Sequence, residues 1–377
     1  MPDLPPLRLT GAEILYENGL CRDAISIAGG RIATSGGREI DLSGFRILPG
    51  IIDLHGDGFE RHMAPRRGAV DSPAAGLAGL DAECAASGIT TAVLAQFWSW
   101  EGGMRSPEFA QTLAQALHGA ETLTAMHLQL RVETHMIDTL DAMLALVRRA
   151  GISFVVWNDH LPHKHLAAGK RPPGLTGQAL KAGRSPEDHA TLLATLHANG
   201  ARLEAALTPI AAELAGLGVR MGSHDDHTGM DRARFRALGA DLCEFPETED
   251  AARAAKDAGE PVIMGAPNVV RGASHSGKIA AEVLIEAGLV DALVSDYHYP
   301  TLARAALKLV PRMGWAAAWG LISSGPARVM GWQDRGRIAP GARADLVIMD
   351  AQGRICGTIA GGRVSHLSGA LAARMLA

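Results

Sequence analysis

Eight short apolar runs, separated by segments rich in Ala and Leu, constrain the fold of this chain more than any other feature. The runs are 47–54, 90–96, 127–133, 153–158, 219–223, 242–245, 262–265 and 292–295. Their lengths suit buried strands, and helix-favouring sequence follows most of them. Strands and helices that alternate in this way predict an α/β fold with a TIM-like (β/α)8 barrel. An open doubly wound sheet is the alternative, but no GxGxxG motif follows an early run.

Both ends of the chain show a different pattern, made of short strands and turns. Segments 7–9, 12–16, 24–28 and 31–33 have it near the start, and segments 344–349, 355–359 and 363–366 have it near the end. Short β segments at opposite ends of a chain often meet in one sheet. We therefore expect residues 1–48 and 336–377 to form one small β-sandwich domain, with the barrel in residues 49–335.

Composition limits the partners and the location of the protein. Hydrophobic residues make up 47% of the 377 residues and charged residues 20%, as in a packed globular protein. The net charge of −4 gives no electrostatic reason to bind nucleic acid or an anionic membrane. No apolar run reaches the length of a membrane helix, and residues 1–10 lack the apolar core of a signal peptide. We expect a cytoplasmic protein, and a homo-oligomer is compatible with the sequence.

Cysteine is scattered, whereas acidic and histidine residues gather just past the predicted strands. The four cysteines show no CxxC spacing, which argues against a disulfide framework and against a thiolate zinc site. By contrast, five of the eight runs end in a histidine, aspartate or glutamate. Side chains at the carboxyl ends of barrel strands converge on one site. Imidazole and carboxylate together suit zinc, manganese or iron, so the pattern predicts a catalytic metal centre.

Two motifs resemble the amidohydrolase superfamily. Residues 48–57 look like the metal motif of its first strand, and residues 336–347 look like its return into the small β domain. Within the superfamily, the chain is similar nearly end to end to α-D-ribose 1-methylphosphonate 5-triphosphate diphosphatases of the carbon–phosphorus lyase pathway. The shared stretches are 87–91, 221–226, 264–277 and 295–297.

This resemblance implies a centre of two divalent metal ions, with zinc expected first and manganese or iron as alternatives. The implied ligands are His55, Asp57, Glu133, His160, His224 and Asp296. In this scheme Asp57 replaces the second histidine of the commoner His-x-His motif, and Glu133 bridges the ions in place of a carbamylated lysine. Asp296 binds metal and also accepts the proton of the attacking water, which makes it the expected catalytic residue.

Basic loops after the first, fourth and seventh strands predict a small anionic substrate. An acidic protein that places cations at one mouth of a barrel focuses an anion there. The candidate substrate-binding residues are Arg61, His62, Lys164, Asp225, Asn268, Arg271, Ser274 and His275. The resemblance implies that the enzyme releases pyrophosphate from α-D-ribose 1-methylphosphonate 5-triphosphate or a close analogue.

Three loops depart from the family pattern and keep other functions under consideration. Gly58 stands where the family has Asn, residues 97–100 are aromatic, and residues 163–165 replace a Pro-Gly-Gln run. If Trp98 and Trp100 line the pocket, they favour a less charged substrate, such as a cyclic amide or N-acyl compound whose C–N bond is cleaved. A metal-free binding protein on the same fold is a second alternative.

Overall fold

The computed structural model describes residues 5–64, 66, 72–272 and 277–376. The chain divides into two compact units, which we call unit 1 and unit 2. Unit 1 consists of Met1–Leu94, Ala120–His127 and Ile263–Ala377, and unit 2 consists of Ala95–Gly119 and Leu128–Val262. Among the described residues, no helix is both long enough and apolar enough to cross a lipid bilayer.

Eight parallel strands form one sheet in chain order, which confirms the predicted α/β barrel fold. They are β8 (Ile51–Gly56), β9 (Ile89–Trp98), β10 (Ala125–Glu133), β11 (Phe154–Asn158), β12 (Arg220–His224), β13 (Leu242–Glu244), β14 (Val262–Gly265) and β15 (Ala292–Val294). A parallel bridge between Gly56 and Asp296 joins the ends of β8 and β15. The first and last strands of the sheet therefore meet, and the barrel is nearly closed.

The first predicted run is the one that differs most from the structure. Residues 47–54 do not form one barrel strand, because β7 (Arg46–Pro49) belongs to another sheet and β8 begins at Ile51. Gly50 separates the two strands at a point of very close packing. A Cβ atom on Gly50 would lie 2.3 Å from Oγ1 of Thr90 and 2.9 Å from Cβ of Asp345. Only glycine fits this approach without a shift of its neighbours.

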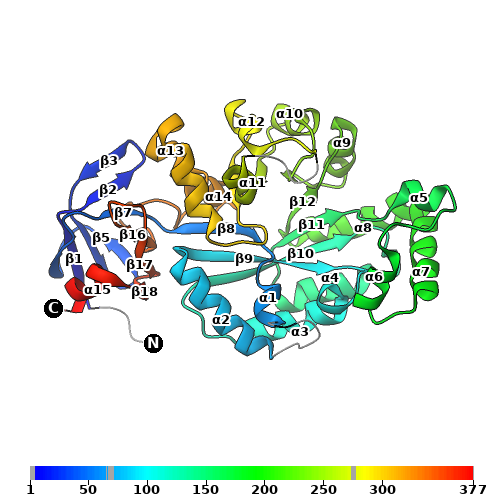
Figure 1. Cartoon of the computed structure of the whole chain (residues 1–377), viewed down its shortest axis with the longest axis horizontal. Coiled ribbons are helices and arrows are strands. Elements are labelled where there is room, and N and C mark those ends of the chain that lie inside the picture. The colour runs from blue at the N-terminus through cyan, green and yellow to red at the C-terminus, as the bar shows by residue number, and fades with distance from the viewer. Residues whose placement is uncertain (1–4, 65, 67–71, 273–276, 377) are drawn as a thin grey trace. The chain divides into compact units, whose positions relative to one another are not determined.

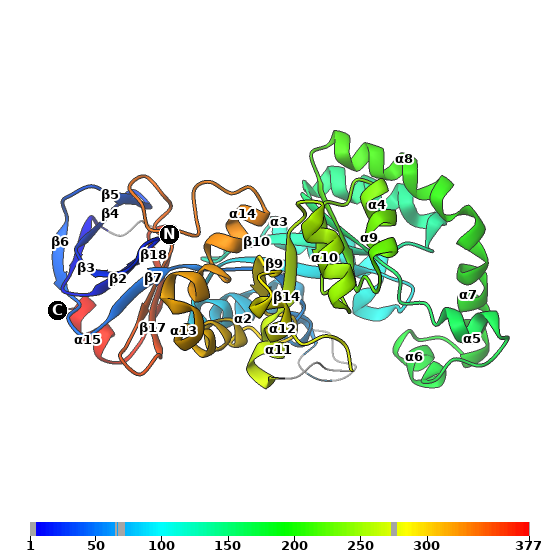
Figure 2. The ribbon, with the colours of Figure 1, turned by 90° about the horizontal axis from the view of Figure 1, so that it is seen from above.

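Strands from both ends of the chain pair in unit 1, as predicted. A six-stranded sheet has the order β18-β17-β16-β7-β2-β3, and a four-stranded sheet has the order β5-β4-β1-β6 (Figures 1 and 2). Their bounds are β1 (Leu7–Thr10), β2 (Glu13–Tyr16), β3 (Gly19–Arg22), β4 (Ile25–Ala28), β5 (Arg31–Ala33), β6 (Arg38–Asp41), β16 (Leu346–Met349), β17 (Ile355–Ala360) and β18 (Arg363–Leu367). The antiparallel pair β7–β16 joins the two ends of the chain. The domain boundaries at 48 and 336 stay a prediction.

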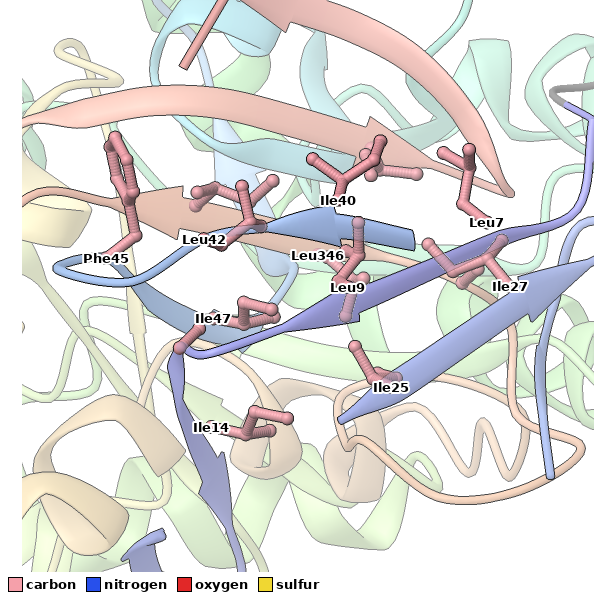
Figure 3. Packing of buried hydrophobic residues seen from close by; sticks show 14 of the residues in the cluster. Leu7, Leu9, Ile14, Ile25, Ile27, Ile40, Leu42, Phe45, Ile47 and Leu346 are labelled. Carbon is pink, nitrogen blue, oxygen red and sulfur yellow. The ribbon is translucent and has the colours of Figure 1, made fainter. Parts of the chain in front are cut away.

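An apolar core fills the space between these two sheets. Leu7 and Leu9 alternate along β1 and are buried, and Leu346 of β16 belongs to the same cluster (Figure 3). Their partners from β4 are Ile25 and Ile27. Burying one such side chain stabilises the fold by about 1.5–3 kcal/mol. Strands β3 and β6 and the helix α15 (Gly369–Leu376) were not predicted from the sequence.

Helices follow the barrel strands in both units. In unit 1 they are α1 (Glu60–Met63), α2 (Pro73–Ala86), α11 (Ala266–Arg271), α12 (Ala281–Glu286), α13 (Thr301–Gly320) and α14 (Ser324–Val329). In unit 2 they are α3 (Pro107–His118), α4 (Leu140–Ala150), α5 (His163–Ala167), α6 (Leu175–Lys181), α7 (Pro186–Ala198), α8 (Leu203–Gly216), α9 (Gly229–Ala237) and α10 (Glu249–Asp257). Short 3-10 turns cover Gly103–Arg105, Ile137–Thr139 and Asn199–Arg202.

A Ser-Pro pair starts three of these helices. Ser72, Ser106 and Ser185 each accept a hydrogen bond from a main-chain N–H of the first turn, and a proline follows each of them. The serine satisfies an N–H that has no helical partner, and proline suits the first helical position. The basic loop predicted after the fourth strand lies in segment 161–182, which contains the helices α5 and α6 that pack with α7 in unit 2 (Figure 2).

Candidate metal centre

Three of the predicted metal ligands come together in unit 1, and we call them the His55 group. Ligand atoms of His55, Asp57 and Asp296 all lie within 4.8 Å of one another. His55 is fully buried on β8, and Asp296 follows β15 with a left-handed backbone of φ 55°. Aspartate tolerates this conformation better than most residues, and strained residues concentrate at functional sites.

Main-chain hydrogen bonds hold the His55 group in place. The amide of Asp296 donates to the carbonyl of His55 at 2.9 Å, and the amide of Asp57 donates to the carbonyl of Asp296 at 2.9 Å. Behind them, the buried carboxylate of Asp53 accepts from the amide and the hydroxyl of Ser295, at 2.9 and 2.5 Å. Burial raises the pKa of Asp53, and the hydrogen bonds from Ser295 oppose that rise. Asp53 therefore ties β8 to the segment that carries Asp296.

A second set of predicted ligands meets in unit 2, and we call Glu133, His160 and His224 the His224 group. Glu133 is buried at the end of β10, and its carboxylate contacts Nδ1 of His160 at 2.5 Å. It also accepts from the amide of His160 at 3.1 Å. The rings of His160 and His224 meet edge to face, with centroids 5.9 Å apart. Burial acts to lower the pKa of His160, but Glu133 outweighs it and raises that pKa.

The imidazole of His224 lies between a carboxylate and a guanidinium group. Its Nδ1 is 2.8 Å from the buried carboxylate of Glu244, and its Nε2 is 2.8 Å from the guanidinium of Arg131. Burial, together with the charge of Arg131, lowers the pKa of His224 to about 4. The ring is therefore neutral at pH 7, with Nδ1–H donating to Glu244 and the lone pair of Nε2 accepting from Arg131. A carboxylate that fixes the tautomer in this way is typical of a metal-binding histidine.

Both groups have donor atoms that suit a divalent transition metal. The His55 group offers one imidazole and two carboxylates, and in unit 2 His160, His224 and Asp225 have ligand atoms within 4.8 Å of one another. Such mixed nitrogen and oxygen donors bind zinc, manganese or iron. The expectation that all six predicted ligands surround one centre stays a prediction.

The predicted anion-binding residues of α1 are engaged with another helix. Arg61 donates to the carbonyl of Tyr297 at 2.9 Å and forms an ion pair with Glu83 of α2. Nε2 of His62 lies 2.5 Å from the same Glu83 carboxylate. Glu83 therefore neutralises part of the positive charge that the sequence pattern assigns to a substrate.

The other predicted substrate contacts have varied surroundings. Arg271 is exposed and donates to the hydroxyl of Tyr297 at 2.8 Å. Asn268 accepts from the amide of Ala281 at 3.2 Å, at the start of α12. Lys164 is exposed on α5. Two further candidates, Ser274 and His275, lie outside the described residues.

The aromatic segment 97–100, whose first two residues are the last of β9, does not offer its tryptophans to a ligand, which corrects one expectation. Trp98 is fully buried and donates to Oγ1 of Thr139 at 2.9 Å. Trp100 is 3% exposed and packs in an apolar cluster with residues of α6 and α7. Phe97 lies between two guanidinium groups, 4.0 Å from Arg131 and 4.2 Å from Arg105. The support that Trp98 and Trp100 gave to a less charged substrate is therefore lost.

Three residues of unit 2 that lie against the predicted ligands were not among the predicted ligands themselves. Glu244 and Arg131 contact His224, and Asp225 was predicted as a substrate contact although its carboxylate lies with His160 and His224. Glu244 occupies the end of β13, so the strand-end pattern contains the signal for it. No such signal marks Arg131, because an arginine within an apolar strand does not reveal which residues its side chain contacts.

Comparison with known proteins identifies the family. The chain is 33% identical over 362 residues to α-D-ribose 1-methylphosphonate 5-triphosphate diphosphatase from Escherichia coli strain K12, covering 90% of this chain and 94% of that protein. No family model matches the chain. The chain belongs to the amidohydrolase superfamily. Within it, the chain belongs to the same family as this diphosphatase, and it is a hydrolase.

Solved structures agree on the fold. A putative prolidase from Bifidobacterium longum has a TM-score of 0.63 at 15% identity, covering 99% of each chain. N-acetylglucosamine-6-phosphate deacetylase from Pasteurella multocida has a TM-score of 0.63 at 12% identity, covering 95% of this chain and 99% of that one. At this low identity, the likeness concerns the fold alone.

Proposed function

We propose that this hydrolase uses two divalent metal ions to release pyrophosphate from α-D-ribose 1-methylphosphonate 5-triphosphate or a close analogue. The observation that carries the proposal is the 33% identity to a diphosphatase of that name over 90% of the chain. The histidine and carboxylate groups in each unit supply donors for the ions. Zinc is the first choice for them, with manganese and iron as alternatives.

The proposed roles of the side chains follow from their positions. His55, Asp57 and Asp296 would hold one ion, and His160, His224 and Glu133 or Asp225 would hold the other. Bound divalent ions lower the pKa of water towards neutrality and stabilise negative charge on phosphate oxygens. Asp296 accepts the proton of the attacking water. The water oxygen bonds to phosphorus, the bond between the α phosphorus and its bridging oxygen breaks, and pyrophosphate leaves from a ribose 5-phosphate.

The substrate is tested by product analysis on the metal-loaded enzyme. We expect one pyrophosphate per molecule of ribose 1-methylphosphonate 5-triphosphate consumed, and no orthophosphate. ATP tests whether any triphosphate suffices, and dihydrouracil tests the cleavage of a cyclic amide. Opening of the amide ring without release of pyrophosphate from the triphosphate would discard the diphosphatase proposal and leave the family membership intact.

Arg271 offers a second test, because its guanidinium is exposed on unit 1. Arg271→Ala should weaken binding of the triphosphate by about 1.5–3 kcal/mol, or roughly 10- to 150-fold, because charge-assisted hydrogen bonds are lost. The measurement is the KM for the triphosphate. Arg312→Ala is the control, since Arg312 is an exposed arginine paired with Glu286 on the surface of the same unit. An unchanged KM in Arg271→Ala would remove Arg271 from the substrate site.

A further inference from the structure

A second cluster of histidines and an acid lies in unit 2, and it shares no residue with the predicted metal ligands. It consists of His135, Asp159 and His163, and we call it the His163 cluster. His135 follows β10, Asp159 follows β11, and His163 begins α5. Their ligand atoms all lie within 4.8 Å of one another.

The separations within the His163 cluster suit a shared ion. Nε2 of His163 is 2.9 Å from each carboxylate oxygen of Asp159, and Nδ1 of His135 is 3.5 Å from Oδ1 of Asp159. Donor atoms that surround one zinc ion at about 2.0–2.1 Å in a tetrahedron are about 3.3 Å apart. The observed separations bracket that value, so an ion could replace the contacts with little movement of the side chains.

A fourth residue, His197, orients His163 within the cluster. Nδ1 of His163 lies 2.8 Å from Nδ1 of His197, near the end of α7. This contact uses the ring nitrogen that faces away from Asp159, so Nε2 stays directed at the carboxylate. A histidine that binds metal through one nitrogen and donates through the other is the usual arrangement in metal sites. The main chain of His135 is fixed as well, because Asn199 donates to its carbonyl at 2.9 Å.

The three side chains of the His163 cluster differ in their exposure to solvent. The side chain of His135 is 5% exposed, that of Asp159 is 25% exposed, and that of His163 is 38% exposed. An ion can therefore reach the cluster from solvent on the side of His163 and lie against the buried His135. Two imidazoles and one carboxylate favour a first-row transition metal over magnesium or calcium, which prefer oxygen donors.

We propose that His135, Asp159 and His163 bind a divalent transition metal ion, separate from the ions of the catalytic centre, with His197 holding His163 in position. Three protein donors leave one position for water. The ion would tie the segments that follow β10 and β11 to α5, the helix that also carries Lys164. The inference does not depend on which substrate the enzyme hydrolyses.

Metal content tests this proposal without any assay of activity. The apoprotein is titrated with Zn²⁺ by calorimetry, in wild type and in His163→Gln. We expect the variant to bind one equivalent less than the wild type. His118→Gln is the matched control, because His118 is a histidine of unit 2 at the end of α3, outside the cluster. Equal Zn²⁺ content in His163→Gln and wild type would overturn the proposal.

A second variant gives an answer even if His163→Gln folds poorly. His163→Cys replaces one zinc ligand with another, since thiolate also binds zinc and cobalt. Loaded with Co²⁺, this variant should show a thiolate-to-metal charge-transfer band that the wild type and a His118→Cys protein lack. Absence of the band in His163→Cys would mean that residue 163 does not bind metal, and the proposal would fail.

Discussion

Main-chain hydrogen bonds position the His55 group, whereas side chains position the His224 group. In the first, the amides of Asp57 and Asp296 bond to carbonyls on the facing strand segment. In the second, Glu244 and Arg131 hold His224 through their side chains. A ligand fixed by its main chain keeps its place when a neighbouring side chain changes, but a ligand fixed by a side chain does not. Similar substitutions should therefore have different consequences in the two groups.

The largest effect is expected from Asp296→Asn in the His55 group. The amide cannot accept a proton from water, and loss of a general base costs about 10²–10⁴ in rate. Because the main chain of Asp296 is bonded to both His55 and Asp57, we expect the variant to keep its metal. The measurements are kcat and metal content on the same sample. Near-normal turnover by a metal-replete variant would exclude Asp296 as the proton acceptor.

In the His224 group, Glu244→Gln should act on metal affinity. The carboxylate of Glu244 fixes the tautomer of His224 and increases the basicity of its other nitrogen, and loss of such a partner typically costs about 10- to 100-fold in affinity. Competition with a chelator measures the Kd for Zn²⁺. Glu213→Gln is the control, because Glu213 is an exposed residue of unit 2 that pairs with Arg148. Unchanged affinity in Glu244→Gln would mean that His224 does not depend on this side chain.

By contrast, a substitution of Asp53, which supports the His55 group, should affect the free energy of unfolding. In Asp53→Asn, an amide replaces the acceptor of hydrogen bonds from the amide and hydroxyl of Ser295. We expect a loss of about 1–2 kcal/mol in the free energy of unfolding. Urea unfolding of the metal-free protein measures it, with the exposed Asp257→Asn as the reference. If Asp53→Asn lowered metal affinity as much as Glu244→Gln, the contrast between the two groups would be wrong.

A smaller, metal-independent effect is expected from His127. Burial, with the charges of Arg335 and Arg343, lowers its pKa from 6.5 to about 4. Between these two pH values the unfolded chain binds a proton that the folded chain does not, so stability falls as the pH decreases. At pH 5.5 the loss is roughly 1–1.5 kcal/mol, and His127→Phe should remove it.

The measurement for His127 is urea unfolding at pH 7.5 and 5.5 in the presence of a chelator. His127 packs on Trp332, with ring centroids 5.3 Å apart, and a phenyl ring can occupy the same place. The loss of stability that His127 causes at low pH has to be subtracted before a loss of metal at low pH is attributed to either ligand group. An identical pH dependence in wild type and His127→Phe would contradict the prediction.

The barrel was predictable because most residues of its strands are apolar and buried. The break at Gly50 was not, since both flanking strands are apolar and periodicity cannot show that β7 and β8 belong to different sheets. The helices α5 and α6 were missed for a local reason. Gly169, Pro172, Pro173 and Gly174 separate two very short helices, and such residues favour turns in any sequence-based interpretation.

The site was predictable to the extent that its residues end strands. His55, His224 and Asp296 follow that rule, so the sequence marks them as candidates, and their roles as metal ligands stay a prediction. Arg131 and Asn199 act through contacts set by the tertiary packing, and no spacing in the sequence predicts those contacts. The same applies to His197, which meets His163 only because α5 packs against α7.

The pairing of β7 with β16 affects how this protein is made in a cell. Residues 46–49 leave the ribosome early, but residues 346–349, which pair with them, are translated only after the whole barrel sequence. Until then β7 has an unpaired edge on the side where β16 will add, and such edges invite pairing with other chains. We infer that the nascent chain passes through a long interval of exposure to aggregation. Arrest of translation before residue 346 should leave chains that chaperones retain.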